Sequence, residues 1–168
     1  MLHRAAALVF AASLLAQQTP APKPEPAPIV KKHSITLSGK TYNYTTTTGR
    51  LPISNEQGEV EAHMFFIAYT LDGAPQKRPL MFSFNGGPGS ASVWLHLGVL
   101  GPKIVKMQDD GGYPPPPFQL IDNEHSFLPF TDMVFIDPVG TGASRPAKGE
   151  KGEQFWGVDE DVEAAPGR

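Results

Sequence analysis

A glycine-rich loop contains the residues of this sequence that are best suited to chemistry. The loop, Asn85-Gly-Gly-Pro-Gly89, directly follows an apolar run at residues 79–84. Gly86 and Gly87 have no Cβ, so a substrate oxygen can approach their backbone N–H groups closely. The side-chain amide of Asn85 adds two more donors. The loop is therefore suited to an anion or a developing oxyanion, and the same residues are equally typical of a tight strand-to-helix turn with nothing bound.

Three strands are predicted upstream of this loop. Residues 33–37 alternate polar and apolar side chains, Ser38-Gly39 is a turn pair, and residues 40–48 are rich in Tyr and Thr. This pattern predicts a β-hairpin. After a predicted turn at residues 55–58, the segment 61–71 predicts a third strand, which is apolar on both faces near its middle.

The loop joins a predicted strand, residues 79–84, to a predicted helix, residues 90–100. Gly101-Pro102 ends that helix. Residues 133–137 predict a second buried strand of parallel type, which opens into another glycine loop at 138–144. The side chains at helical spacing are Val93, Trp94, Leu97 and Leu100, and we expect Trp94 to be a core residue.

This order of elements is the one in which an α/β-hydrolase sheet begins. The predicted fold class is α/β: the N-terminal part of an α/β-hydrolase fold, with antiparallel hairpin strands leading into a mostly parallel sheet. We expect this fold to be truncated, with residues 133–137 left as an open apolar edge that pairs or aggregates. Residues 148–154 are predicted to be a loop, and residues 156–162 the start of a helix.

The N-terminal residues are not expected to join the folded domain. A short positive start and an apolar run predict a signal peptide over residues 1–16, and alternating prolines predict an extended linker over residues 17–31. The incomplete domain then covers residues 32–168, and the protein is expected to be secreted or periplasmic. The net charge is −3, without a basic stripe that would indicate nucleic acid binding, and the chain has no cysteine for a disulfide or a thiol nucleophile. No other segment approaches the length of a membrane span.

Several segments together resemble the serine carboxypeptidase family. Their order and spacing match that family from about Pro79 to Val162. The segments are Asn85-Gly-Gly-Pro-Gly89-Ser90, Gly101-Pro102, Asn123-Glu-His-Ser-Phe127, Phe135-Ile-Asp-Pro-Val-Gly-Thr-Gly-Ala-Ser144 and Trp156-Gly-Val-Asp-Glu-Asp161.

The resemblance implies a role for each residue of the first loop. Gly87 would donate its N–H to the oxyanion, which is the catalytic contribution expected from this chain. Asn85 and Gly86 would bind the terminal carboxylate of the substrate, a peptide or protein with a free C-terminus. The loop at 137–144 would line the same cleft as scaffold. No cofactor and no metal are implied.

The sequence also departs from the family. Val99 stands where eukaryotic members carry a glutamic acid of the carboxylate-binding network, and Val99 has no group that can donate a hydrogen bond. No Gly-x-Ser-x-Gly type elbow occurs, so the nucleophile, acid and histidine of a triad are not found in this chain. Ser90, Ser92 and Ser144 follow the wrong strands for a nucleophile. The five histidines, expected to be surface or core residues without metal spacing, are His3, His33, His63, His96 and His125.

The resemblance therefore implies that the chain is the N-terminal portion of an exported serine-type carboxypeptidase, which we expect to be inactive by itself. Two alternatives stay open. One is a non-catalytic protein that binds peptide C-termini through the Asn85 loop, and the other is an acyltransferase built on the same family. The sequence indicates no oligomeric state.

Overall fold

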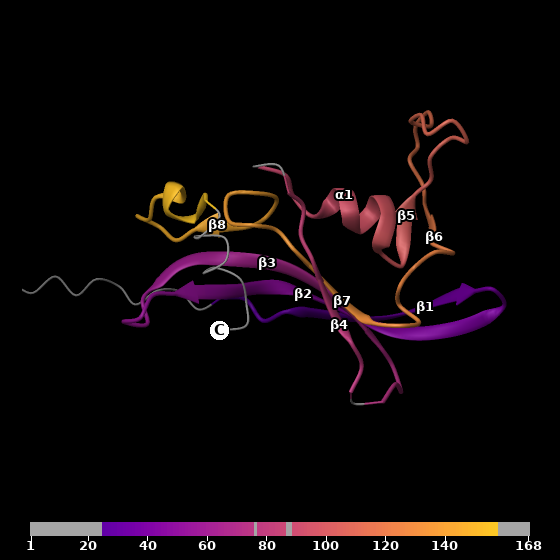
Figure 1. Cartoon of the computed structure of the whole chain (residues 1–168), viewed down its shortest axis with the longest axis horizontal. Coiled ribbons are helices and arrows are strands. Elements are labelled where there is room, and N and C mark those ends of the chain that lie inside the picture. Colours follow the sequence, from indigo (N-terminus) through magenta and orange to yellow (C-terminus); the bar gives the residue numbers. More distant parts are fainter. Residues whose placement is uncertain (1–24, 76, 87–88, 158–168) are drawn as a thin grey trace, which may run out of the picture.

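The structure, a computed structural model, describes residues 25–75, 77–86 and 89–157. The main body within these ranges is a twisted sheet whose strands follow the order β1-β2-β3-β7-β4, with β8 beside β3. Short helical segments lie over one face of this sheet (Figure 1). The predicted signal peptide, most of the predicted linker, Gly87 and the predicted helix after Gly157 lie outside the described residues.

The predicted N-terminal hairpin is confirmed. Strand β1 (Ile29–Leu37) pairs antiparallel with β2 (Lys40–Ser54). The two turn residues, Ser38 and Gly39, have φ angles of 48° and 78°. Positive φ at both positions is typical of a type I′ turn, whose twist matches that of the flanking strands. β1 begins inside the segment predicted as linker, because its first residues, 29–31, pair with residues 46–48 of β2.

The third predicted strand, β3 (Val60–Leu71), is also confirmed and forms the middle of the sheet. It pairs antiparallel with β2 on one side and with β7 (Asp132–Ile136) on the other. The three long strands form the curved ribbon in the lower half of Figure 1. The side chains that share the core beneath the helical segment are Ile35, Leu37, Tyr44, Tyr69, Leu128, Met133 and Phe135.

Two sequence expectations about the sheet are wrong. β4 (Leu80–Ser83) pairs parallel with β7, but the other pairings in the described sheet are antiparallel, so the sheet is mostly antiparallel. Residues 133–137 are not an edge either. The chain crosses over after β4 and returns as β7 between β3 and β4, which leaves β4 as the outer strand. β7 is hydrogen-bonded along both edges because it has a strand on each side. Its buried side chains are Met133, Phe135 and Ile136.

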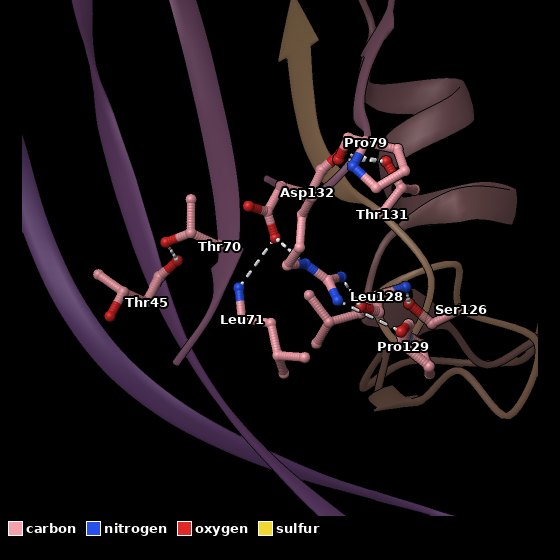
Figure 2. Close-up of polar contacts among 10 residues, drawn as sticks. Thr45, Thr70, Leu71, Pro79, Ser126, Leu128, Pro129, Thr131 and Asp132 are labelled. Atoms are coloured by element: carbon pink, nitrogen blue, oxygen red, sulfur yellow. Dashed lines mark hydrogen bonds and ion pairs between the residues drawn. The ribbon is translucent and has the colours of Figure 1, made fainter. Parts of the chain in front are cut away.

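A polar cluster holds β4 and β7 together where both strands begin. Arg78, just before β4, donates from Nε to Asp132 Oδ1 at 3.0 Å, and its other nitrogens donate to the carbonyls of Leu128 and Pro129. The same Asp132 oxygen accepts the Leu71 N–H at 3.1 Å. Figure 2 shows Asp132 between the end of β3 and the turn before β7. These bonds fix the parallel register at the end of the strands opposite to the Asn85 loop.

The predicted helix at residues 90–100 is shorter than expected. It consists of α1 (Val93–Leu95) and a π-helical turn, η1 (His96–Leu100), and it ends at Gly101-Pro102 as predicted. The expectation that Trp94 faces the core is wrong, because its side chain is 62% exposed. The face turned to the sheet carries Ser92, His96 and Leu100 instead, at positions i, i+4 and i+8.

Four smaller elements were not predicted. β5 (Lys103–Val105) and β6 (Leu120–Asp122) pair as a separate antiparallel ribbon. β8 (Arg145–Pro146) pairs with β3, and the segment predicted as a loop at 148–154 contains part of a 3₁₀-helix, η2 (Gly152–Phe155). A second small core lies there, made by Ala62, Val139 and Phe155. None of the helices in the described part of the chain is long and apolar enough to cross a membrane.

Candidate functional site

The Asn85 loop leaves the sheet at the carboxyl end of β4, the outer strand. Asn85 is half-buried and Gly86 is exposed. Among the described residues other than its chain neighbours, no atom lies within 4 Å of the position that a Cβ of Gly86 would take. The structure therefore places two of the three predicted site residues side by side at an open backbone. The third, Gly87, is outside the described residues.

The donors of Asn85 are only weakly engaged. Its side-chain nitrogen donates to the Gly86 carbonyl at 3.3 Å, in an exposed part of the loop. This distance is beyond the usual range for an N–H···O bond, so an incoming anion can replace the carbonyl at little cost. Further along, Gly89 has a φ of 96°, a conformation that other residues rarely adopt. The glycine thus lets the chain turn from the loop into the helical segment.

A buried carboxylate ties the end of this loop to the next strand. Asp137, directly after β7, is 5% exposed. Its Oδ1 accepts hydrogen bonds from the backbone N–H of Ser92 at 2.9 Å and from the Ser92 hydroxyl at 2.8 Å. Its Oδ2 accepts the Ala143 N–H at 3.0 Å. One side chain therefore holds both glycine loops at the same end of the sheet.

The loop at 137–144 is itself heavily hydrogen-bonded. The Ser144 hydroxyl donates to the Asp137 carbonyl at 2.6 Å and accepts the Phe65 N–H at 2.7 Å, which attaches the loop to β3. Arg145 donates to the carbonyls of Gly142 and Ser144 at 2.9 and 2.7 Å. These contacts support the interpretation of this loop as scaffold, because its polar groups are used within the fold.

A buried histidine projects from the face of the helical segment that is turned to the sheet. The His96 ring, in a residue only 7% exposed, forms a hydrogen bond with the Tyr69 hydroxyl of β3 and lies with its centroid 4.7 Å from that of Phe135. Burial lowers the pKa of His96 to about 4, although the nearby Asp137 charge opposes this shift. Burial also raises the pKa of Tyr69. Both groups are therefore neutral at pH 7.

The described serines and histidines do not form a nucleophile–base pair. Ser92 and Ser144 are both buried. The Ser92 hydroxyl donates to the Asp137 carboxylate, and the Ser144 hydroxyl donates to the Asp137 backbone carbonyl. Within residues 25–75, 77–86 and 89–157, no hydrogen bond joins a serine hydroxyl to a histidine ring. His96 bonds to a tyrosine, and His63, in β3 as predicted, pairs with Glu25. A triad needs the serine bonded to the histidine, so this cluster has the wrong connectivity for one.

Asn123 connects two of the segments that resemble the family, Gly101-Pro102 and the segment 123–127. Its side-chain nitrogen donates to the carbonyls of Val99 and Gly101 at 2.8 Å each, and its backbone N–H bonds to the Pro102 carbonyl. A buried asparagine thus satisfies the carbonyls at the end of η1, which have no partner within the helix. Val99 itself is exposed.

Sequence reasoning missed three residues of this region: Asp137, His96 and Asn123. Asp137 ends an apolar strand immediately before a glycine loop, which is a position where a buried acid can bond loop N–H groups, and this signal was present in the sequence. His96 gave no comparable signal, because its partner, Tyr69, lies on a strand far away in the sequence. Asn123 was part of a resembling segment, but its two carbonyl partners required the structure.

Comparison with known proteins gives a consistent result. A family model described as serine carboxypeptidase matches residues 38–163. A pheromone-processing carboxypeptidase of Phytophthora infestans is 31% identical over 99 residues, which cover 55% of this chain and 15% of that protein. Carboxypeptidase Y of Saccharomyces cerevisiae is 30% identical over 103 residues, which cover 61% of this chain and 17% of that protein. Serine carboxypeptidase-like 45 of Arabidopsis thaliana is 26% identical over 145 residues, which cover 79% of this chain and 29% of that protein. The chain thus spans less than a third of the length of these relatives.

Proposed function

This chain belongs to the serine carboxypeptidase family, and from this we propose that it is the N-terminal portion of an exported enzyme that removes residues from peptide C-termini by acyl transfer. The observation that carries the proposal is the Asn85 loop at the carboxyl end of β4, with an open backbone at Gly86. In α/β folds, ligands bind beyond the carboxyl ends of the parallel strands.

Within this proposal, the loop binds two negative charges. Asn85 Nδ2 and the Gly86 N–H hold the terminal carboxylate of the substrate, and the Gly87 N–H stabilises the oxyanion that forms when the scissile carbonyl is attacked. The resemblance to the family implies this division, and the number of donors agrees with it, because the loop offers more N–H groups than one oxyanion requires. The weak bond from Asn85 Nδ2 to the Gly86 carbonyl supports it, since that donor is easily redirected.

The nucleophile, the acid and the histidine of the reaction are supplied, in this proposal, by a part of the enzyme that lies outside this 168-residue chain. The buried hydroxyls of Ser92 and Ser144 support this view, because each already has a structural partner. An oxyanion hole stabilises charge that develops only after attack by a nucleophile. The chain by itself is therefore expected to bind substrate without cleaving it.

Carboxylate recognition is tested by comparing a blocked dipeptide that has a free C-terminus with the same peptide amidated. Asn85→Ala removes a hydrogen bond to a charged group, which is worth about 1.5–3 kcal/mol, so affinity for the free acid should fall roughly ten- to a hundredfold. Affinity for the amide should change much less. Asn55→Ala is the matched control, because Asn55 lies in the distant turn between β2 and β3. Equal losses for both peptides would contradict the assigned role.

A non-catalytic protein that binds peptide C-termini is the second candidate. It is favoured by the same observation that the hydroxyls of Ser92 and Ser144 are used structurally. The two candidates predict different results when the protein made from the whole reading frame is given a blocked dipeptide. An enzyme would release the C-terminal residue from a blocked dipeptide, whereas a binding protein would hold the dipeptide intact.

A further inference from the structure

We propose that Asp137 is a positioning residue that sets the Asn85 loop at the geometry required for carboxylate recognition. This inference rests on the function proposed above for that loop. Among the described donors of the loop, neither Asn85 Nδ2 nor the Gly86 N–H is hydrogen-bonded to Asp137. It acts through Ser92, the residue at which the loop passes into the helical segment.

The hydrogen bonds to Asp137 divide between the two loops. Oδ1 receives both donors of Ser92, at the end of the Asn85 loop, and Oδ2 receives the Ala143 N–H, in the loop after β7. All three donors are neutral, and they occupy both oxygens of a carboxylate that is almost fully buried. Hydrogen bonds to a charged acceptor are about twice as strong as those between neutral groups, so this side chain is a firm link.

Among the described residues of the loop, Ser83 at its start is also buried, and the residues around Gly86 and Gly89 are not. Ser83 is buried at the end of β4, whereas Gly86 and Gly89 are exposed and have open space around the position of a Cβ. Asn85 makes only a weak bond within the loop. The position of the donors between Ser83 and Ser92 therefore depends on these two ends. The position of the second end is set by Asp137.

The Asp137 carboxylate is packed closely against Gly142, in the loop after β7. A Cβ at Gly142, where φ is 45°, would lie 1.8 Å from Asp137 Oδ2 and 3.0 Å from the Ala91 Cβ. The two loops thus touch through Ala91 and Gly142 next to the carboxylate. An asparagine at position 137 has one oxygen for donors that arrive from two directions.

The test uses the whole 168-residue chain labelled with ¹⁵N and the two peptides described above, a blocked dipeptide with a free C-terminus and its amide. Asp137→Asn is compared with Asp132→Asn. Asp132 is the matched control, since it is a carboxylate at the opposite end of β7 that also accepts a backbone N–H. The readout is the ratio of the two affinities. A loss of folded protein lowers both affinities equally and leaves their ratio unchanged.

Asp137→Asn is expected to lower the preference for the free acid about tenfold, the effect of misplacing one hydrogen bond to a charge, while Asp132→Asn keeps it. If the wild type prefers the free acid and Asp137→Asn retains that preference, the positioning role is overturned but the proposed function stands. If the wild type shows no preference, the proposed function fails. In that case, the spectra recorded without peptide still test whether Asp137 positions the Asn85 loop.

In those spectra, Asp137→Asn should shift or broaden the Gly86 amide signal, and Asp132→Asn should leave it in place. An unchanged Gly86 signal in Asp137→Asn would overturn the inference whatever the peptides do. Ser92→Ala is a milder second variant in case Asp137→Asn does not fold. It removes the hydroxyl bond and keeps the backbone N–H bond, so it should move the Gly86 signal in the same direction by a smaller amount.

Discussion

The buried pair of His96 and Tyr69 predicts a specific loss of stability in acid. The perturbation is a change from pH 7 to pH 4. Burial holds the pKa of His96 at about 4, against a usual value of 6.5. Between these two values the unfolded chain binds a proton that the folded chain does not bind. The free energy of unfolding therefore falls as the pH falls through this window, and it recovers as the pH rises.

The magnitude follows from the size of the shift. Each pKa unit corresponds to about 1.4 kcal/mol, so a shift from 6.5 to about 4 corresponds to about 3 kcal/mol between pH 7 and pH 4. A typical domain has only about 5–15 kcal/mol of stability, so the loss is large. It is a local effect, because the proton would have to be bound by a ring that is buried against Phe135 and hydrogen-bonded to Tyr69.

The assay is urea unfolding followed by fluorescence at several pH values, for the wild type and for the double variant His96→Leu, Tyr69→Phe. The double variant removes both polar groups, so no hydroxyl is left buried without a partner. Between pH 7 and pH 4, the free energy of unfolding of the double variant should fall by about 3 kcal/mol less than that of the wild type. His125→Gln, which changes an exposed imidazole, is the control. The reasoning is refuted if the double variant loses as much stability in acid as the wild type does.

Three further predictions concern the rest of the chain. The exported protein should lack residues 1–16, and mass spectrometry that finds them retained would disprove the predicted signal peptide. Phe82→Lys should reduce the amount of sedimentable aggregate, because Phe82 is exposed on the outer strand β4. Tyr113→Lys, at an exposed loop residue, should not reduce it. The purified chain should not be labelled by a serine-directed fluorophosphonate, since Ser92 and Ser144 are buried and bonded. Stoichiometric labelling that is lost when one serine is changed would place a nucleophile in this chain.

The sequence was sufficient to predict the elements that depend on local patterns. The Ser38-Gly39 turn, the alternation along the hairpin and the apolar run at 133–137 each carry a signal within a few residues, and the structure has a strand or turn at each. The order of strands carries no such signal. Nothing in residues 133–137 says on which side of β4 they return, so the outer strand was assigned wrongly.

The orientation of the helical segment was mispredicted for a different reason. Apolar spacing selected Trp94 for the core, but the two contacts that orient the segment are polar. One is the bond of Ser92 to Asp137, and the other is the bond of His96 to Tyr69. A serine and a histidine on the buried face look like surface residues until their partners on distant strands are known. The Asn85 loop itself was located correctly at a strand end, because its glycines and proline are a local signal.

The most direct test of the central claim is to locate the carboxylate of a bound peptide. The chain labelled with ¹⁵N is titrated with a blocked dipeptide that carries a ¹³C-labelled terminal carboxylate. Our account predicts that the largest shifts occur at the Gly86 N–H and the Asn85 side-chain amide, that the carboxylate carbon lies within direct dipolar contact of those nitrogens, and that the amidated dipeptide produces neither effect. Equal shifts with the amidated dipeptide, or a carboxylate located away from Asn85 and Gly86, would contradict it.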